Sequence, residues 1–160
     1  MVNNKEPRFL VDKMLGRLAK WLRVFGYDSV YSSDKFGAQL LLESLRENRI
    51  LLTRGKKLSD KRGWKVIYLK SDHVSEQLKQ LVEEIGLRYS LDRIFSRCTI
   101  CNGKITVVSD KKVVESVVPE YVYKTQDVFY QCENCKQLYW KGTHLNLIEK
   151  DIKDLGIEVK

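Results

Sequence analysis

The sequence predicts an α/β fold, in which helices flank a parallel sheet and a small β-rich module follows. Three observations carry this prediction. Short apolar runs alternate with amphipathic helical segments through the first 95 residues. Two Cys-x-x-Cys pairs stand 30 residues apart in the second half of the chain. Between residues 98 and 140 the chain is rich in Val, Tyr and Thr and shows no helical period.

Four apolar runs separated by amphipathic segments make up the first half of the expected fold. The expected strands are residues 8–12, 27–31, 49–53 and 64–69, and the expected helices are residues 13–25, 36–47 and 74–85. The first helix is followed by Gly26 as a C-terminal cap, and its apolar stripe consists of Met14, Leu15, Leu18, Leu22 and Phe25. Strands separated by single helices of this length predict right-handed crossovers and a parallel sheet.

The character of the sequence changes near residue 95. Beyond it we expect a helix at residues 146–155 and short strands around Val113-Val114, Val117-Val118, Val122-Tyr123 and Phe129-Tyr130. The expected organisation is therefore a sheet domain at residues 1–94, a β-rich module at residues 95–145 and a C-terminal helix or tail at residues 146–160.

The net charge of +8 is concentrated in the expected sheet domain. Residues 1–97 hold 20 Lys and Arg against 12 Asp and Glu, whereas residues 98–160 hold nine of each. A domain with one dominant sign of charge attracts polyanions, and nucleic acid is the commonest such partner. Solubility is the alternative explanation, and charge alone does not separate RNA from DNA.

The sequence lacks the usual signals for export and membrane insertion. No stretch approaches the ~20 continuous apolar residues that span a bilayer, and residues 1–6 lack the apolar run of a secretory signal. We therefore expect a cytoplasmic protein whose thiols stay reduced.

Four cysteines provide the most specific motif in the chain. They form two Cys-x-x-Cys pairs, Cys98 with Cys101 and Cys132 with Cys135. Each pair can form a tight turn that aims two sulfurs at one point, and Gly103 and Asn134 favour such turns. Together the pairs supply the four thiolates of a closed tetrahedral Zn²⁺ site, as in a zinc ribbon. Because no coordination position stays open, we expect this zinc to be structural.

The alternatives for the cysteines are weaker. A redox Cys-x-x-Cys needs no second copy, and two disulfides do not suit a reducing compartment. An iron–sulfur cluster uses the same ligands, but this spacing is less typical of one.

Acidic residues are expected near the carboxyl ends of the strands, where ligands bind in open parallel sheets. Asp12 ends the first strand, Asp34 lies just beyond the second, and Asp72 follows the fourth. Converging carboxylates bind Mg²⁺ or Mn²⁺, which activates water and stabilises charge on a phosphodiester. Each acid also has a structural explanation as a helix cap or a loop residue. The candidates to hold backbone phosphates are Lys13, Arg17, Lys20, Arg54, Lys56, Lys57 and Arg62.

Six motifs, in the family's order, resemble the Mut7-C domain. They are residues 9–23 (FLVDKMLGRLAKWLR), 26–28 (GYD), 49–54 (RILLTR), 95–98 (FSRC), 101–103 (CNG) and 139–144 (YWKGTH). The resemblance spans roughly residues 8–145. It implies a PIN-like nuclease domain fused to a zinc ribbon, with metal-dependent ribonuclease activity.

The resemblance also implies where the catalytic acids belong. In the family one acid ends the first strand, a second lies near the start of the second helix, and a third follows the LLTR run. Here Asp12 fills the first position, whereas the second helix opens with residues 35–39 (KFGAQ) and Gly55 follows the LLTR run. Asp34, Asp60 and Asp72 are therefore the candidates to replace the missing acids, and the enzyme hypothesis uses Asp12 with Asp34 and Asp72.

Three hypotheses follow for the function. The first is a metal-dependent endoribonuclease that acts on single-stranded or structured non-coding RNA. The second is a PIN-like module that binds RNA or a ribonucleoprotein without cleaving it. The third, a protein-binding zinc adaptor, leaves the basic first domain unexplained. Residues 139–144 either stack on an RNA base or, as we expect, pack the ribbon against the sheet domain through Trp140.

Overall fold

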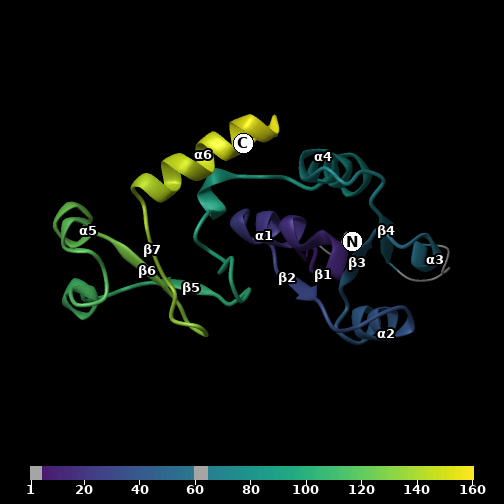
Figure 1. Cartoon of the computed structure of the whole chain (residues 1–160), viewed down its shortest axis with the longest axis horizontal. Coiled ribbons are helices and arrows are strands. Elements are labelled where there is room, and N and C mark those ends of the chain that lie inside the picture. Colours follow the sequence, from purple (N-terminus) through teal and green to yellow (C-terminus); the bar gives the residue numbers. More distant parts are fainter. Residues whose placement is uncertain (1–4, 60–64) are drawn as a thin grey trace.

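The computed structural model describes residues 5–59 and 65–160, which form a parallel sheet between helices, a smaller antiparallel sheet and a C-terminal helix (Figure 1). The parallel sheet consists of β1 (Phe9–Asp12), β2 (Ser29–Ser32), β3 (Ile50–Thr53) and β4 (Val66–Tyr68) in the order β2-β1-β3-β4. In this register Leu10 of β1 lies opposite Val30 of β2 and Leu51 of β3. The predicted α/β fold with a parallel sheet is confirmed. Trp64, where the fourth strand was expected to begin, lies outside the described residues.

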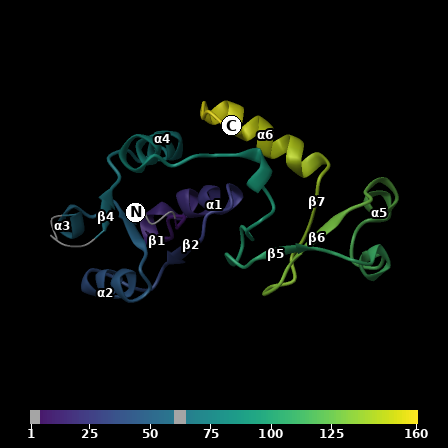
Figure 2. The ribbon, with the colours of Figure 1, turned by 180° about the vertical axis from the view of Figure 1, so that it is seen from behind.

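Helices cover both faces of the parallel sheet because its strands alternate apolar side chains between the two faces. Phe9, Val11 and Leu52 share a core cluster with residues of α1 (Gly16–Val24) and α4 (Val74–Ile85). Leu10 and Leu51 pack in a second cluster with residues of α2 (Ala38–Arg46) and α3 (Lys56–Ser59). Figures 1 and 2 show α1 and α4 on one side of the sheet and α2 on the other.

The helix expected at residues 13–25 begins as a 3₁₀ turn, and Met14, which was expected on its apolar stripe, is 66% exposed. Asp12 begins the 3₁₀ turn η1 (Lys13–Leu15) by accepting a hydrogen bond from the Lys13 backbone N–H at 2.6 Å. After α1, the N–H groups of Gly26 and Tyr27 donate back to helix carbonyls, each at 2.9 Å, in the pattern of a Schellman cap. Gly26 has a φ of +80°, and a Cβ there would lie 2.4 Å from the Ser96 hydroxyl. The cap therefore needs glycine both for its conformation and for space.

The second module is a three-stranded antiparallel sheet with a helical excursion. Its strands are β5 (Ile105–Val107), β6 (Phe129–Cys132) and β7 (Leu138–Trp140) in that order. Between β5 and β6, where we expected further strands, the chain forms η3 (Lys111–Val114) and α5 (Glu120–Thr125).

The valines of this excursion explain the wrong strand prediction. Val114, Val118 and Val122 are buried together with Phe129 in a small cluster of their own. Their spacing of four residues is helical, but the β-branched composition suggested strands. Trp140 packs on this cluster, with its ring centroid 6.2 Å from that of Phe129.

The two modules share one hydrophobic core. After η2 (Leu91–Arg93), Phe95 stacks on Tyr130 with 5.7 Å between ring centroids and lies 5.8 Å from Tyr139. Tyr139 therefore joins the ribbon to the main core, a role that we expected of Trp140.

The C-terminal helix α6 (Thr143–Leu155) begins three residues earlier than predicted. It runs from the ribbon back over the sheet domain (Figures 1 and 2), and its Ile152 is buried in the same cluster as Leu18 and Leu78. Of the helices in the described part of the chain, none has the length and apolar character needed to cross a membrane.

Candidate functional site

Asp12 lies at the carboxyl edge of the parallel sheet, at the end of one of its two central strands. Its side chain is nearly buried, with 9% of the residue exposed. The Lys13 backbone N–H donates to Oδ1 at 2.6 Å, and the hydroxyl of Thr53, at the end of the neighbouring β3, donates to Oδ2 at 2.8 Å. Thr53 Oγ1 in turn accepts a hydrogen bond from the Gly55 N–H at 2.9 Å. The Asp12 carboxylate is thereby fixed through both of its oxygens.

Thr53 is a residue to which we assigned no role from the sequence. It is fully buried, and it is the last residue of β3, after Ile50, Leu51 and Leu52. A polar residue at the end of an apolar strand can mark a site residue, and this pattern could have identified Thr53 from the sequence. What the sequence does not reveal is that β3 lies directly beside β1.

The strand order keeps the other two predicted acids apart. Asp34 lies beyond β2 and Asp72 beyond β4, and these are the outer strands at opposite edges of the sheet. With neighbouring strands about 4.8 Å apart, β2 and β4 are separated by about 14 Å. Both acids are exposed, and Asp72 pairs only loosely with His73, at 3.6 Å. Asp60, the further candidate, lies outside the described residues.

Asp12, Asp34 and Asp72 are therefore not gathered around a common point. Among residues 5–59 and 65–160, the cysteines form the one group of three or more His, Cys, Asp or Glu residues whose ligand atoms converge. The catalytic roles of Asp34 and Asp72 stay predictions, without a shared site to support them.

The predicted phosphate-binding cations fall into three groups. Lys13, Arg17 and Lys20 are exposed and follow one another at spacings of four and three residues, so they form a stripe along η1 and α1. Lys56 and Lys57 are exposed on α3. Arg54 is half-buried and donates to the Leu69 carbonyl at 3.4 Å, whereas Arg62 lies outside the described residues.

Exposed aromatic rings flank the same edge. The Lys13 ammonium lies 4.4 Å from the ring centroid of Phe36, which is 54% exposed. The Tyr31 hydroxyl donates to the Lys13 carbonyl at 2.7 Å, and Tyr31 is 39% exposed. Neither ring was singled out from the sequence, because nothing local places it beside Asp12. Rings and cations together suit single-stranded nucleic acid.

The four cysteines of the ribbon meet at one point. The Sγ atoms of Cys98 and Cys135 are 3.6 Å apart, those of Cys101 and Cys132 are 3.4 Å apart, and all four lie within 4.8 Å of one another. A tetrahedron with Zn–S bonds of ~2.3 Å has sulfur–sulfur edges of about 3.8 Å. The cluster is therefore consistent with a zinc site whose four positions are all filled by protein ligands.

The two cysteine turns close in the same way. Asn102 and Lys136, each directly after the second cysteine of its pair, have left-handed φ values of 67° and 65°. Their N–H groups donate to the carbonyls of Cys98 and Cys132 at 2.9 Å and 3.1 Å. We expected Asn134 and Gly103 to serve the turns, but Gly103 is instead needed for space. A Cβ at Gly103 would lie 2.8 Å from Cys132 Sγ.

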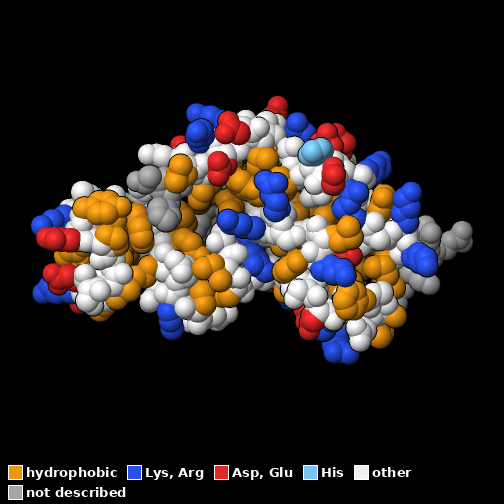
Figure 3. Space-filling view, in the orientation of Figure 1, with side chains coloured by type: hydrophobic (Ala, Val, Ile, Leu, Met, Phe, Trp, Pro, Cys, Tyr) orange, Lys and Arg blue, Asp and Glu red, His pale blue; other side chains and the backbone are white. Residues whose placement is uncertain are grey.

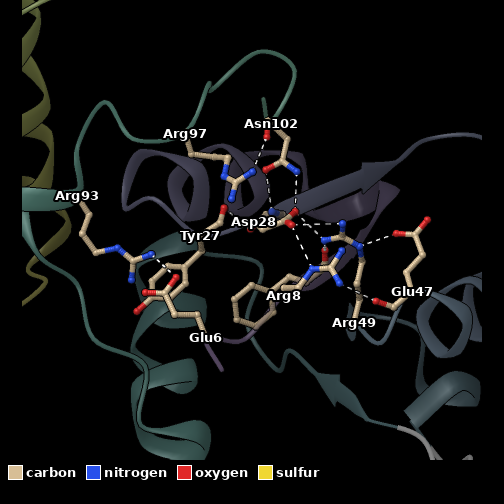
Figure 4. Close-up of polar contacts among 11 residues, drawn as sticks. Glu6, Arg8, Tyr27, Asp28, Glu47, Arg49, Arg93, Arg97 and Asn102 are labelled. Carbon is tan, nitrogen blue, oxygen red and sulfur yellow. Dashed lines mark hydrogen bonds and ion pairs between the residues drawn. The ribbon is translucent and has the colours of Figure 1, made fainter. Parts of the chain in front are cut away.

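Asp28 connects the first cysteine turn to the sheet domain (Figure 4). It accepts hydrogen bonds from Arg49 at 2.7 Å, from the Asn102 side chain at 2.8 Å and from Arg8 at 3.2 Å. The Asn102 side-chain oxygen accepts from the Ser29 N–H at 2.9 Å. Burial acts to raise the pKa of Asp28, but the hydrogen bonds from Arg49 and Asn102 outweigh it and lower the pKa to about 2.

Arg23 makes the second connection between the modules. Its buried guanidinium donates from Nε to the Ser29 carbonyl at 2.9 Å and from Nη1 to the carbonyls of Thr99 and Ile100, both at 3.1 Å. Thr99 and Ile100 are the two residues between the first pair of cysteines. Arg23, Asp28 and Asn102 all belong to the six motifs that resemble the Mut7-C domain. In the structure they dock the first cysteine turn on the sheet domain.

A helix-flanked parallel sheet with an appended four-cysteine ribbon defines an α/β protein that carries a metal-binding module. A family model described as the Mut7-C RNAse domain matches residues 7–152, so the chain belongs to the Mut7-C RNAse domain family. The resemblance seen in the six motifs is thereby confirmed over nearly the whole chain. Neither the curated proteins nor the solved structures gave a match.

Proposed function

We propose that the protein binds RNA across the carboxyl edge of its parallel sheet and cleaves the strand beside Asp12. Membership of an RNAse domain family suggests a ribonuclease-like function. The observation that carries the proposal is the Asp12 carboxylate, held by Lys13 and Thr53 at the ends of the two central strands. Exposed cations and the rings of Tyr31 and Phe36 lie beside it.

A single carboxylate suits a cation that is shared with the substrate. Mg²⁺ is usually held by one or two carboxylates together with substrate phosphates. Asp12 would be the protein ligand, and the cation supplies positive charge next to the scissile phosphate. Thr53 keeps the carboxylate in one orientation, and the Lys13 stripe binds the flanking backbone.

One observation favours a second candidate function, RNA binding without cleavage. Asp34 and Asp72 follow strands at opposite edges of the sheet, and in the described ranges no three acids that include Asp12 bring their carboxylates together. Under this alternative the same basic edge holds RNA, and no divalent cation is needed.

Cleavage of labelled single-stranded RNA with added Mn²⁺ or Mg²⁺, measured beside equilibrium binding, separates the two functions. Asp12→Asn is expected to lower cleavage about 100-fold or more while binding changes less than about twofold. Thr53→Val, which loses the hydroxyl, is expected to lower cleavage about tenfold, whereas the control Thr53→Ser retains it.

The remaining outcomes are equally decisive. Wild-type protein that binds RNA with a steep salt dependence but never cleaves it supports the second candidate. Protein that neither binds nor cleaves RNA contradicts both.

A further inference from the structure

A cavity of about 620 Å³ lies where the two modules and α6 meet, along α1 from Arg17 to Val24. It is bordered by α1, by residues 94–99, by Tyr139 of β7 and by the exposed side of α6. Figure 3 shows the surface hollowed beneath α6, with Lys and Arg side chains next to apolar ones. Asp12 and the four cysteines do not line the cavity, whereas Arg17 and Lys20 of the basic stripe do.

The lining of this cavity combines basic and aromatic side chains. Arg17 and Lys20 project from α1, and no ion pair engages either of them within the described parts of the chain. Arg97 lies beside them, with its guanidinium held by the Asn102 carbonyl at 3.1 Å. Trp21, which is half-buried, supplies a flat apolar surface, whereas Phe95 is 8% exposed and stacks on Tyr130. Cations beside aromatic rings fit a phosphate and a base.

The part of the lining that α6 contributes contains two acids. Asp151 and Asp154, three residues apart on α6, both line the cavity, and no ion pair holds either one in the described ranges. Acids near the C-terminus of a helix are unfavourable because they repel its dipole, so helix stability does not explain them. Two carboxylates also oppose a bare polyanion. They suit a ligand that presents hydrogen-bond donors on that side, because a carboxylate only accepts.

We propose that this cavity is a subsite for one RNA nucleotide, with the phosphate against Arg17, Lys20 and Arg97 and a guanine base edge against Asp151 and Asp154. Guanine presents two adjacent donors, N1–H and N2–H, which match the two oxygens of a carboxylate. Uracil presents a single donor between two carbonyls that the acids would repel. Single-stranded RNA is read in this way, by stacking and by hydrogen bonds to exposed base edges.

The subsite rests on the proposed RNA binding and extends it along the strand. The stripe of Lys13, Arg17 and Lys20 leads from Asp12 to the cavity. Residues 13 and 20 are about 10 Å apart along the axis at 1.5 Å per residue. A strand that lies on the stripe therefore reaches Asp12 at one end and the cavity at the other.

Binding of two labelled octanucleotides, UUUUGUUU and all-uridine, tests the subsite in buffer without added Mg²⁺ or Mn²⁺. The wild type is expected to bind the guanine-containing strand about tenfold more tightly. Asp151→Ala/Asp154→Ala should remove this preference while all-uridine binding improves, since two negative charges are lost. Lys20→Ala should weaken both strands by the same factor. Asp127→Ala, an exposed acid outside the cavity, is the matched control and should change neither.

Equal binding of both strands by the wild type overturns the subsite but not the proposed function. A double variant that binds both strands more tightly by one common factor also overturns it, because the acids then act only through their charge. Binding of GMP as tight as that of the octanucleotide assigns the cavity to a free nucleotide and overturns its place on an RNA strand. Failure to bind either strand overturns the proposed function as well.

Discussion

Asp28 and Arg49 form an ion pair at 2.7 Å beneath the first cysteine turn. The guanidinium of Arg49 is almost fully buried, and Asp28 also bonds Arg8 and Asn102. A buried charge is tolerated only when it is paired and hydrogen-bonded, and these contacts meet that condition. The same logic holds for Asp12, whose partners are a backbone N–H and a threonine hydroxyl. Asp12, Asp28 and Arg49 are thus held by hydrogen bonds within the fold, whereas Lys13, Arg17 and Lys20 are exposed to solvent.

The lowered pKa of Asp28 predicts how the stability of the protein depends on pH. Its folded pKa of about 2 lies below the ordinary value of 3.8, so the carboxylate stabilises the fold fully above about pH 4. This contribution is lost as the pH falls through 2. We expect Asp28→Asn to cost about 2 kcal/mol at pH 7, and the difference from wild type to shrink between pH 4 and pH 2.5.

Urea unfolding of both proteins at pH 7, 4 and 2.5 measures this difference. Because Asp28 also supports the first cysteine turn, metal content is measured at each pH, and the comparison uses the pH values at which both proteins hold the same metal. A gap in unfolding free energy that stays constant over the whole range would contradict the assignment.

Among the elements, α1 has two functions on its two sides. One side buries Leu18 and Leu22 in the core, and its last turn sends Arg23 to the carbonyls between the first two cysteines. The other side carries Arg17 and Lys20 into solvent and towards the cavity. The helix therefore couples the position of the metal-binding turn to that of the basic stripe.

Removal of the Arg23 guanidinium should loosen the cysteine turn. Arg23→Met keeps the aliphatic stem but loses three hydrogen bonds to carbonyls, so we expect a loss of about 3 kcal/mol in unfolding free energy. Release of zinc to a competing chelator should become about tenfold faster. Lys20→Met, on the exposed side of the same helix, is the control and should stay within about 0.5 kcal/mol of wild type. Unchanged zinc release in Arg23→Met would show that the turn does not depend on this docking.

The excursion between β5 and β6 is a segment whose secondary structure was predicted wrongly from its composition. Composition favoured strands there, but Val114 of η3, Val122 of α5 and Val118 between the two elements form one buried cluster. The strands and the longer helices of the first half were predicted well because their length, period and turn residues agreed with one another, whereas the short helix α3 was not predicted.

At the scale of the whole molecule, the two modules share the main core cluster, and the excursion of the ribbon adds a small cluster of its own. Tyr130 and Tyr139 of the ribbon, Ile152 of α6 and Leu78 of α4 pack around the same cluster. Loss of order in the ribbon therefore exposes apolar surface of the sheet domain. We expect the two modules to unfold together, although the character of the sequence changes near residue 95.

Metal removal tests this coupling. We expect about one zinc per chain by elemental analysis, and we expect Cys132→Ser to lose the metal. The thermal midpoint of the variant should fall in a single transition that includes the sheet domain. Ser109→Ala, an exposed ribbon residue, is the control and should leave metal content and midpoint unchanged. Two separate transitions, with that of the sheet domain unaltered, would mean that the modules fold independently.

By itself the sequence determined the α/β class, the first-half elements, the cysteine tetrad and Asp12 as a strand-end acid. These follow from period, length and spacing, which act between residues that are close in the chain. The tertiary structure alone decided that Thr53 supports Asp12, that Asp34 and Asp72 stand at opposite edges, and that α6 closes a cavity with α1. Strand order and helix docking pair residues that are distant in sequence, and no local pattern records which partners will meet.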